Sequence, residues 1–322
     1  MEKHCFTDIP GIIAGHAQDI NAATGCTIVI CENGAVAGVD VRGGSPGTRE
    51  TDTLNPICVG KSVHAVLLAG GSAFGLDAAA GVMQYLETHG IGRDVVETKI
   101  PIVCGAVLFD LKCGDYRRRP DKEMGYRACC NAYSGKWANG SVGAGTGAMV
   151  GKTKGNRFAM KGGLGSVCLR IGDLFVGAVM AVNCVGDVYD ACAGKLVAGV
   201  LDDERRTIEG TEQLILENYA KRSDFFGGNT VIGAVATNAQ LSKPEANKLA
   251  SVAQNGIAAA IRPAHTAYDG DTIFTLATGK VEANPDAVGI LAVRAVEQAI
   301  VQAVKSATAL AGIPAYRDVF DS

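Results

Sequence analysis

A threonine stands at the point where a turn gives way to a predicted strand. Gly227, Gly228 and Asn229 are turn formers, and the run from Thr230 to Thr237 is rich in β-branched residues. In one interpretation, Thr230 is the first residue of an ordinary strand. In the other, the chain is cut between Asn229 and Thr230. The new N-terminal threonine then carries a hydroxyl nucleophile together with its own base, the free α-amine.

Two carboxylates follow further along the chain, in the string Asp269-Gly270-Asp271. In extended backbone they point to the same face, because side chains alternate along a strand. Two close carboxylates are unfavourable unless a cation or hydrogen-bond donors meet them. The string is therefore either a solvated turn or a pair that holds an ammonium group, and a threonine at a new N-terminus would supply that group.

A glycine-rich segment that ends in Gly151-Lys152-Thr153 is similar to a phosphate-binding loop. The spacing differs by one residue, since Thr146 stands where the first glycine of such a loop belongs. No apolar strand that ends in a magnesium-binding aspartate accompanies the segment. A nucleotide-binding protein that uses Lys152 is therefore kept only as an alternative to a hydrolase.

Composition excludes several other classes of protein. The 322 residues are 48% hydrophobic and 20% charged, with a net charge of -3, so the chain has a sizeable core and no general attraction for nucleic acid or an anionic membrane. We expect no membrane insertion, because no segment approaches the roughly 20 apolar residues of a span. Five scattered histidines and eleven irregularly spaced cysteines without a CxxC motif predict no metal site, no cofactor and a reducing, cytoplasmic location.

Short strands and helices alternate along the chain and predict one domain of mixed β and α layers, 1–322. Strands are predicted at 26–31, 35–42, 63–69, 102–108, 165–171, 174–183, 230–237 and 271–277. Helices are predicted at 72–89, 207–222, 242–261 and 284–307, the last two with capping residues and a first-turn proline.

Several ordered motifs give the chain a specific family resemblance. It resembles the L-aminopeptidase/D-esterase family of N-terminal-nucleophile hydrolases, which includes β-aminopeptidases and nylon-oligomer hydrolase. Besides Asn229-Thr230, Lys152 and the two aspartates, the motifs are Asp8-Ile9-Pro10-Gly11 with Gly15-His16, Gly38 to Gly44, Gly70 to Asp77, Val142 to Gly147, Lys161 to Ser166, and Val182-Asn183. The match extends over nearly the whole chain.

The resemblance implies an α+β fold, a four-layer αββα sandwich of the N-terminal-nucleophile type. It also implies an inactive precursor that cuts itself into chains 1–229 and 230–322, a small peptide or amide substrate, and a homo-oligomer, a tetramer of cleaved protomers. Some members have Gly-Ser at the cut and a Ser/Glu pair, whereas Asn229-Thr230 with two aspartates is the pattern of nylon-oligomer hydrolase. That pattern favours an amidase. Acyl transfer of the ornithine-acetyltransferase type is a further alternative, because that enzyme is similar in fold and in its threonine nucleophile.

The resemblance also implies roles for the site residues. Thr230 is the nucleophile, and its α-amine, with an ordinary pKa of about 7.7 to 8.0, accepts the hydroxyl proton. Asp271, with Asp269 behind it, orients that amine. Lys152 stabilises the ionised threonine oxygen, and Asn183 donates to the oxyanion. The competing interpretations are a surface lysine and a turn asparagine.

Overall fold

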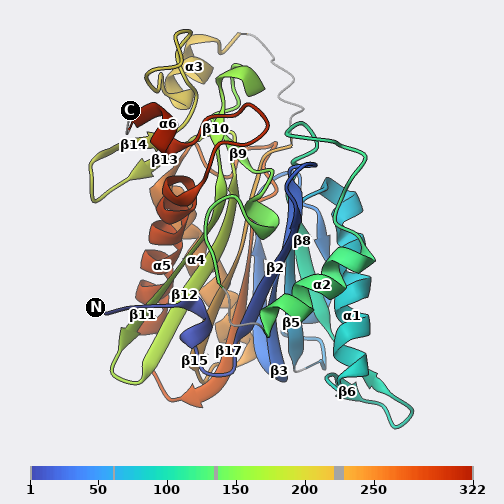
Figure 1. The fold of residues 1–322 in the computed structure, drawn as a ribbon. Helices are drawn as coiled ribbons and strands as arrows, with labels where there is room; N and C mark the ends of the chain where they lie inside the picture. The colour runs from blue at the N-terminus through green and yellow to red at the C-terminus, as the bar shows by residue number, and fades with distance from the viewer. Residues whose placement is uncertain (1, 61, 134–136, 221–227, 321–322) are drawn as a thin grey trace.

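Two face-to-face β-sheets that share one long strand form the centre of the molecule (Figure 1). The structure, a computed structural model, describes residues 2–60, 62–133, 137–220 and 228–320. The shared strand is β3 (Thr24–Val41). Its first part pairs with β2 and β5, and its last part pairs with β17. The strand changes sheet around Gly34, which has a φ of +73° that few other residues adopt.

The first sheet contains the strand that begins at Thr230 and the strand that follows Asp269 and Asp271. Its order is β1 (Glu2–His4), β11 (Gly163–Ile171), β12 (Leu174–Asn183), β15 (Thr230–Ala239), β17 (Thr272–Val281) and β3. The second sheet contains β2 (Ile13–Asp19), β3, β5 (Val63–Ala69), β8 (Val103–Val107) and β4 (Thr48–Arg49). Strands β15 and β17 are parallel, so both begin at the same end of the sheet.

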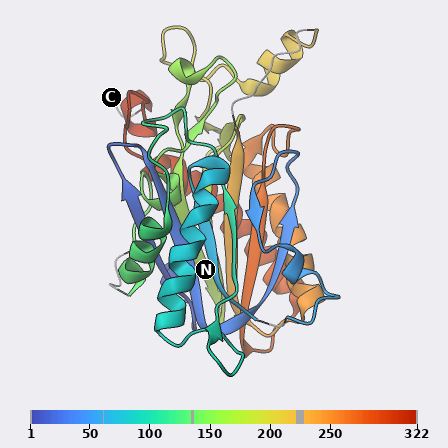
Figure 2. The same cartoon turned by 90° about the vertical axis from the view of Figure 1, so that its right-hand side faces the viewer.

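Helices cover the outer face of each sheet, so the predicted four-layer αββα sandwich is confirmed (Figures 1 and 2). The first sheet is covered by α4 (Lys243–Ala260) and α5 (Pro285–Ser306), and the second by α1 (Ala78–Thr88) and α2 (Lys122–Ala132). Alternation along the strands builds the layers. In β15, Val231 and Val235 face the helices, whereas Ile232 and Ala234 face the other sheet.

The predicted helix ends are partly correct. The capping box of Ser242 and Glu245 begins α4, and the Asn284 side chain caps α5. The helix predicted at 72–89 begins instead with a 3-10 segment, Ser72–Asp77, before α1. The helix predicted at 207–222 is the shorter α3 (Thr211–Glu217), and residues 221–222 lie outside the described part.

Helix α5 corrects one sequence expectation. By length and composition it is apolar enough to cross a membrane, with a mean hydropathy of 1.5 over 18 residues, so the statement that no segment approaches a span is wrong. In the structure 56% of that window is buried within the protein. The helix packs on β11, β12 and α4, which accounts for its long apolar stripe.

Short elements complete the described chain. They are β6 (Arg93–Asp94), β7 (Lys99–Ile100), β9 (Met149–Val150), β10 (Met160–Lys161), β13 (Asp187–Asp190), β14 (Lys195–Ala198), β16 (Ile261–Arg262) and α6 (Tyr316–Phe320).

Candidate active site

Thr230 is the first residue of β15 and lies between the two neighbouring strands that carry the other predicted residues. In the register of β12 with β15 it is directly opposite Asn183. On its other side, Asn229 is bridged in parallel to Asp269, just before β17. Thr230 is buried, with 5% of its surface exposed. The sheet therefore brings together residues about 40 positions apart in the sequence, as the hypothesis of a site requires.

The carbonyl group of the Asn229–Thr230 peptide bond has two donors. The backbone N–H of Gly270 donates to the Asn229 oxygen at 3.0 Å. The Thr230 hydroxyl also donates to that oxygen. A side chain at Gly270 would interfere, since a Cβ there would lie 2.9 Å from the Thr230 hydroxyl oxygen and 2.7 Å from the Ser45 carbonyl oxygen. The glycine between the two aspartates thus allows this close approach.

The Asp271 carboxylate is buried and accepts three hydrogen bonds. Its Oδ1 accepts from the Val231 N–H at 2.8 Å. Its Oδ2 accepts from the backbone N–H of His265 at 3.2 Å and from His265 Nδ1 at 2.8 Å. The solvated-turn interpretation is therefore wrong. His265 is a residue that sequence reasoning missed, because a single histidine six positions before Asp271 belongs to no spacing pattern.

Asp269 is buried with fewer donors. Its Oδ2 accepts from the Thr266 N–H at 2.8 Å, while its Oδ1 has no hydrogen-bond partner among the described residues. Burial, followed by the nearby charge of Asp271, raises the pKa of Asp269 to about 6. The Asn229 side-chain oxygen is also buried and has no partner in the described chain. A cation placed beside this pair would relieve the repulsion between the carboxylates.

Lys152 and Asn183 converge on the residue before Asn229. Lys152 Nζ donates to the carbonyl oxygens of Asn183 at 2.8 Å and Gly228 at 3.2 Å. Asn183 Nδ2 donates to Gly228 at 3.2 Å and to Phe109 at 3.0 Å. Burial lowers the pKa of Lys152 to about 8. The interpretations as a surface lysine and a turn asparagine are wrong, but both side chains hold a backbone carbonyl rather than the Thr230 oxygen.

The phosphate-loop alternative fails on local structure. A phosphate-binding loop leads directly into an α-helix whose N-terminus faces the anion. Here Lys152 and Thr153 lead into a turn and a 3-10 segment, Asn156–Phe158. The ammonium of Lys152 is occupied by two carbonyl groups. Lys152 instead contacts the segment that precedes Thr230.

A cavity of about 380 Å³ opens beside Thr230. Hydroxyl groups of Ser45, Ser72 and Tyr268 and apolar side chains line it; the full lining is Ser45, Pro46, Gly47, Ser72, Ala73, Val107, Leu108, Phe109, Gly228, Asn229, Thr230, Ala267 and Tyr268. The loop 133–137 contributes no lining residue from its described part, Tyr133 and Trp137. Its Trp137 stacks on Phe6, and residues 134–136 lie outside the described part.

No group of three or more histidine, cysteine, aspartate or glutamate side chains among the described residues is arranged to hold a metal ion.

Comparison with known proteins places the site in context. The profile of "Peptidase family S58" matches residues 4–317. An uncharacterized aminopeptidase of Mycobacterium leprae is 43% identical, over 98% of this chain and 94% of its own. The 6-aminohexanoate-oligomer endohydrolase of Paenarthrobacter ureafaciens is 30% identical, over 92% and 85% of the two chains.

Solved structures share the fold at low identity. The L-aminopeptidase D-Ala-esterase/amidase of Ochrobactrum anthropi, described as a variant of the N-terminal-nucleophile hydrolase fold, matches with a TM-score of 0.69 at 20% identity, over 94% of this chain and 85% of that one. A Burkholderia sp. β-aminopeptidase matches with a TM-score of 0.68 at 20% identity, over 98% and 92%.

Proposed function

Since this chain belongs to peptidase family S58 and is a hydrolase of amide bonds, we propose that it cuts itself before Thr230 and then uses Thr230 as an N-terminal nucleophile. One observation carries the proposal. The Thr230 hydroxyl contacts the carbonyl group of the peptide bond that would be cut, and the Gly270 N–H donates to the same carbonyl oxygen. Nucleophile and oxyanion donor are thus already present in the uncut chain.

Self-cleavage would proceed through an ester. The Thr230 oxygen attacks the Asn229 carbonyl carbon, and the Gly270 N–H stabilises the negative charge that develops on the carbonyl oxygen. The carbon–nitrogen bond breaks, the nitrogen takes a proton, and the acyl group rests on the threonine oxygen. Water then hydrolyses the ester, leaving the Asn229 carboxylate and the free α-amine of Thr230.

Release of the new chain end would expose the donors that the site needs for turnover. Lys152 Nζ and Asn183 Nδ2 both donate to the Gly228 carbonyl in the uncut chain. Once this segment withdraws, both are free to donate to the oxygens of an incoming substrate. The buried pair Asp269 and Asp271 would meet the ammonium form of the Thr230 amine, which supplies the missing cation.

Turnover repeats the same chemistry on a separate substrate. The neutral amine accepts the hydroxyl proton of Thr230, the oxygen attacks the substrate amide, and the amine product leaves with a proton. Water then releases the acid product from the ester. The cavity beside Thr230 suits a small, uncharged acyl group, because its described lining offers hydroxyl and apolar groups but no charged side chain. The substrates to test first are short peptides and ω-amino-acid oligomers. A relative that is 30% identical is named as an endohydrolase of one such oligomer, the 6-aminohexanoate oligomer.

The test joins chain length to activity. We expect the purified protein to consist of fragments of 229 and 93 residues, the smaller beginning Thr-Val-Ile-Gly, and to hydrolyse small amides. Intact mass and N-terminal sequencing measure the first property, and release of amine from α-, β- and ω-linked substrates measures the second. Full-length chain alone after long incubation would contradict the proposal. Product formed on an added amine such as ornithine, in place of free acid, would indicate acyl transfer.

A further inference from the structure

The segment between β8 and α2 carries an excess of positive charge. Residues 110–119 contain one lysine and three arginines against two aspartates, a formal net charge of +2. The residues just before them, Val107, Leu108 and Phe109, line the cavity beside Thr230, whose described lining has no charged side chain. Along the chain, positive charge thus begins where the uncharged wall of the cavity ends.

Arg119 differs from the other two arginines of this segment. Arg117 and Arg118 each pair with an aspartate, at 2.9 and 3.7 Å. Arg119 forms no ion pair with any described residue, and its guanidinium carbon lies 4.0 Å from the centre of the Phe74 ring. A guanidinium placed over an aromatic face still presents its N–H groups to a planar acceptor. Arg119 is therefore available for an anion from outside the chain.

The fold places Arg119 beside the wall of the cavity. Gly71 has a φ of +81°, and a Cβ there would lie only 3.2 Å from the Cβ of Arg119. The two residues that follow, Ser72 and Ala73, line the cavity. Phe74 comes next and is 60% exposed. The guanidinium and the ring beneath it thus adjoin the residues that form one side of the cavity.

The buried Asp110 ties the two segments together. Its carboxylate, only 3% exposed, accepts from the backbone N–H of Gly71 at 2.7 Å. The Ser72 N–H donates to the Leu108 carbonyl oxygen at 2.9 Å. The segment that carries Arg119 is thus fixed to the turn that lines the cavity. A group held in place before binding loses less conformational entropy when it contacts a ligand.

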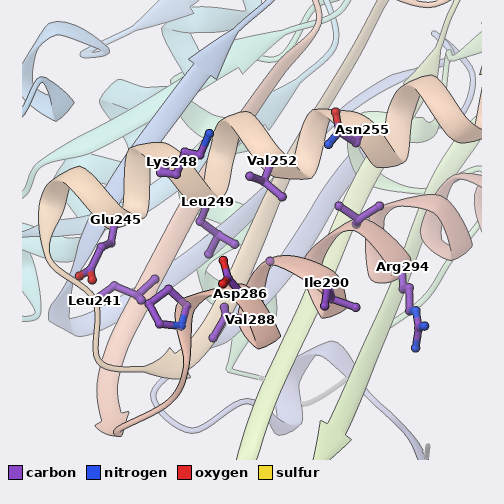
Figure 3. Close-up of a pocket in the computed structure, with 13 residues that line it drawn as sticks. Leu241, Glu245, Lys248, Leu249, Val252, Asn255, Asp286, Val288, Ile290 and Arg294 are labelled. Carbon is purple, nitrogen blue, oxygen red and sulfur yellow. The ribbon is translucent and has the colours of Figure 1, made fainter.

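A second hollow in the surface has a different balance of charge (Figure 3). A groove of about 570 Å³ lies between α4 and α5 and shares no lining residue with the cavity beside Thr230. Its charged lining residues are two carboxylates and two cations, Glu245, Asp286, Lys248 and Arg294. That groove has no net attraction for an anion, whereas an uncharged cavity next to a positively charged segment has one.

We propose that Arg119 binds a carboxylate on the amine half of the substrate, so that the enzyme selects amides whose amine product is an amino acid. The inference rests on the proposed function, in which the cavity holds the uncharged acyl half beside Thr230. Short peptides and ω-amino-acid oligomers carry a carboxylate on the amine half. The planar fork of an arginine matches the two oxygens of that group.

Three synthetic amides separate the charge from its position. The N-acetylated dimer of 6-aminohexanoate has a carboxylate on its amine half, and its C-terminal carboxamide is neutral. The N-succinylated carboxamide has a carboxylate on its acyl half only. We expect the parent to hydrolyse the first with a kcat/KM about tenfold higher than that of the other two, mainly through a lower KM. Mass spectrometry of the products gives the rates at the amide between the two units.

Substitution of Arg119 identifies the contact. Arg119→Gln should reduce the preference for the first amide to less than about twofold, and Arg119→Glu should reverse it. Arg119→Lys should keep part of the preference, because the charge remains without the planar fork. Arg117→Gln is the matched control, since that exposed arginine already pairs with Asp115, and it should keep the preference of the parent. Self-cleavage and melting temperature confirm that each variant is folded.

The contrary results are distinct from one another. Equal rates on the three amides in the parent, or an unchanged preference in Arg119→Gln, would overturn the contact. An equal gain for the N-succinylated amide would overturn its assignment to the amine half. A parent that hydrolyses none of the three would contradict the proposed function itself, and the inference with it.

His265 supports a second inference, which comes from a different contact and also rests on the proposed function. We infer that His265 is a positioning residue for Asp271. His265 Nδ1 lies 2.8 Å from Asp271 Oδ2, and the two side chains are only 16% and 2% exposed. The other oxygen of Asp271 accepts from Val231, the residue after the nucleophile. His265 therefore fixes the carboxylate that lies beside the new N-terminus, without a contact to Thr230 itself among the hydrogen bonds described.

The geometry determines which nitrogen of His265 matters. An ionised carboxylate only accepts hydrogen bonds, so Nδ1 must carry a proton and donate it. The backbone of His265 has a φ of +55°, a conformation that asparagine and glycine tolerate better than most residues. Asparagine places its amide nitrogen near the position of Nδ1. Glutamine places it nearer the position of Nε2, which has no partner among the described residues.

Three variants separate the donor from the backbone. We expect His265→Gly, which keeps the backbone conformation and loses the donor, to slow cleavage and turnover on the order of tenfold, with kcat affected more than KM. His265→Asn should recover most of the rate, and His265→Gln should not. Equal rates for the glycine variant and the parent, or equal rescue by asparagine and glutamine, would overturn the inference. Failure of the parent to cut itself would instead contradict the proposed function.

Discussion

Two lysines, the half-buried Lys152 and the fully buried Lys161, make the same kind of hydrogen bonds in different surroundings. Each ammonium donates to two backbone carbonyls, and burial lowers each pKa to about 8. The acceptors of Lys152 are Asn183, which pairs with Thr230 across the sheet, and Gly228, one residue before Asn229. Those of Lys161 are Thr146 at 2.8 Å and Ala148 at 2.7 Å, within one glycine-rich loop.

The difference shows that a lowered pKa does not by itself identify a catalytic lysine. Lys161 is fully enclosed, and both of its acceptors are buried residues of a segment that does not contain the proposed cut. Lys152 is partly exposed and holds Gly228, whose segment would withdraw after the cut. We therefore assign Lys161 to the fold and Lys152 to the reaction, and substitutions of the two lysines should have different effects.

The largest effect is expected at Thr230. The loss of cleavage and hydrolysis in its variants is the standard with which the lysine variants are compared. Thr230→Ala should abolish self-cleavage and amide hydrolysis while leaving a folded chain, because loss of one hydroxyl at a strand start costs little stability. Thr230→Ser should still cut, since a primary hydroxyl can make the same attack. Gel electrophoresis and an amide assay measure both. An uncut alanine variant that still hydrolyses amides would show that the nucleophile lies elsewhere.

Lys152→Met should slow cleavage and turnover by about 10²- to 10³-fold, the usual cost of losing a donor to a developing negative charge. Its melting temperature should change little, because Asn183 Nδ2 still donates to the Gly228 carbonyl. Single-turnover rates of self-cleavage and of substrate hydrolysis give the comparison. If the methionine variant keeps the parent rates, Lys152 is a structural residue like Lys161.

Much of the fold could be predicted from the sequence. Local signals gave the caps of α4 and α5, and the motifs gave the αββα layers. The local signals failed at 72–89, where the chain forms a 3-10 segment, Ser72–Asp77, before α1. The missed apolarity of α5 has a physical reason. Its alanines and valines lie among a few charged residues, so the pattern looks amphipathic, although most of its length faces the core.

The site could be predicted less completely. Thr230 and the two aspartates were found because a hydroxyl after a turn and paired carboxylates are local patterns. Their meeting depends on the parallel pairing of β15 with β17, which no local signal contains. His265 could not be found, because its contact with Asp271 accompanies a left-handed backbone conformation at this position that no local sequence signal indicates. The Gly270 N–H was equally invisible, since a backbone donor has no sequence signature.

Lys161→Met should act in the opposite way to Lys152→Met. We expect a loss of a few kcal/mol in the free energy of unfolding, because two buried carbonyls lose their donor and the buried Asp110 loses a nearby cation. The rate of cleavage in the folded fraction should change less than about tenfold. Urea unfolding of the uncut Thr230→Ala chain measures the stability. The half-buried Lys154 is the matched control, since its ion pairs with the solvent-accessible Asp203 and Glu209 lie at the protein surface and contribute little.

The smallest effect is a slope with pH, and it tests what the two lysines share. In each, the folded pKa is about 8, below the ordinary 10.5, so between these values the unfolded chain binds more protons than the folded one. The stability contributed by this difference is complete above pH 10.5 and is lost as the pH falls through 8, so unfolding free energy should rise with pH across that window. One group contributes at most about 1.4 kcal/mol per pH unit. In the uncut Thr230→Ala chain, Lys152→Met and Lys161→Met should each flatten the slope, while Lys154→Met should leave it unchanged. If only Lys161→Met flattens the slope, the Lys152 ammonium reaches water. The two lysines would then not share the lowered pKa.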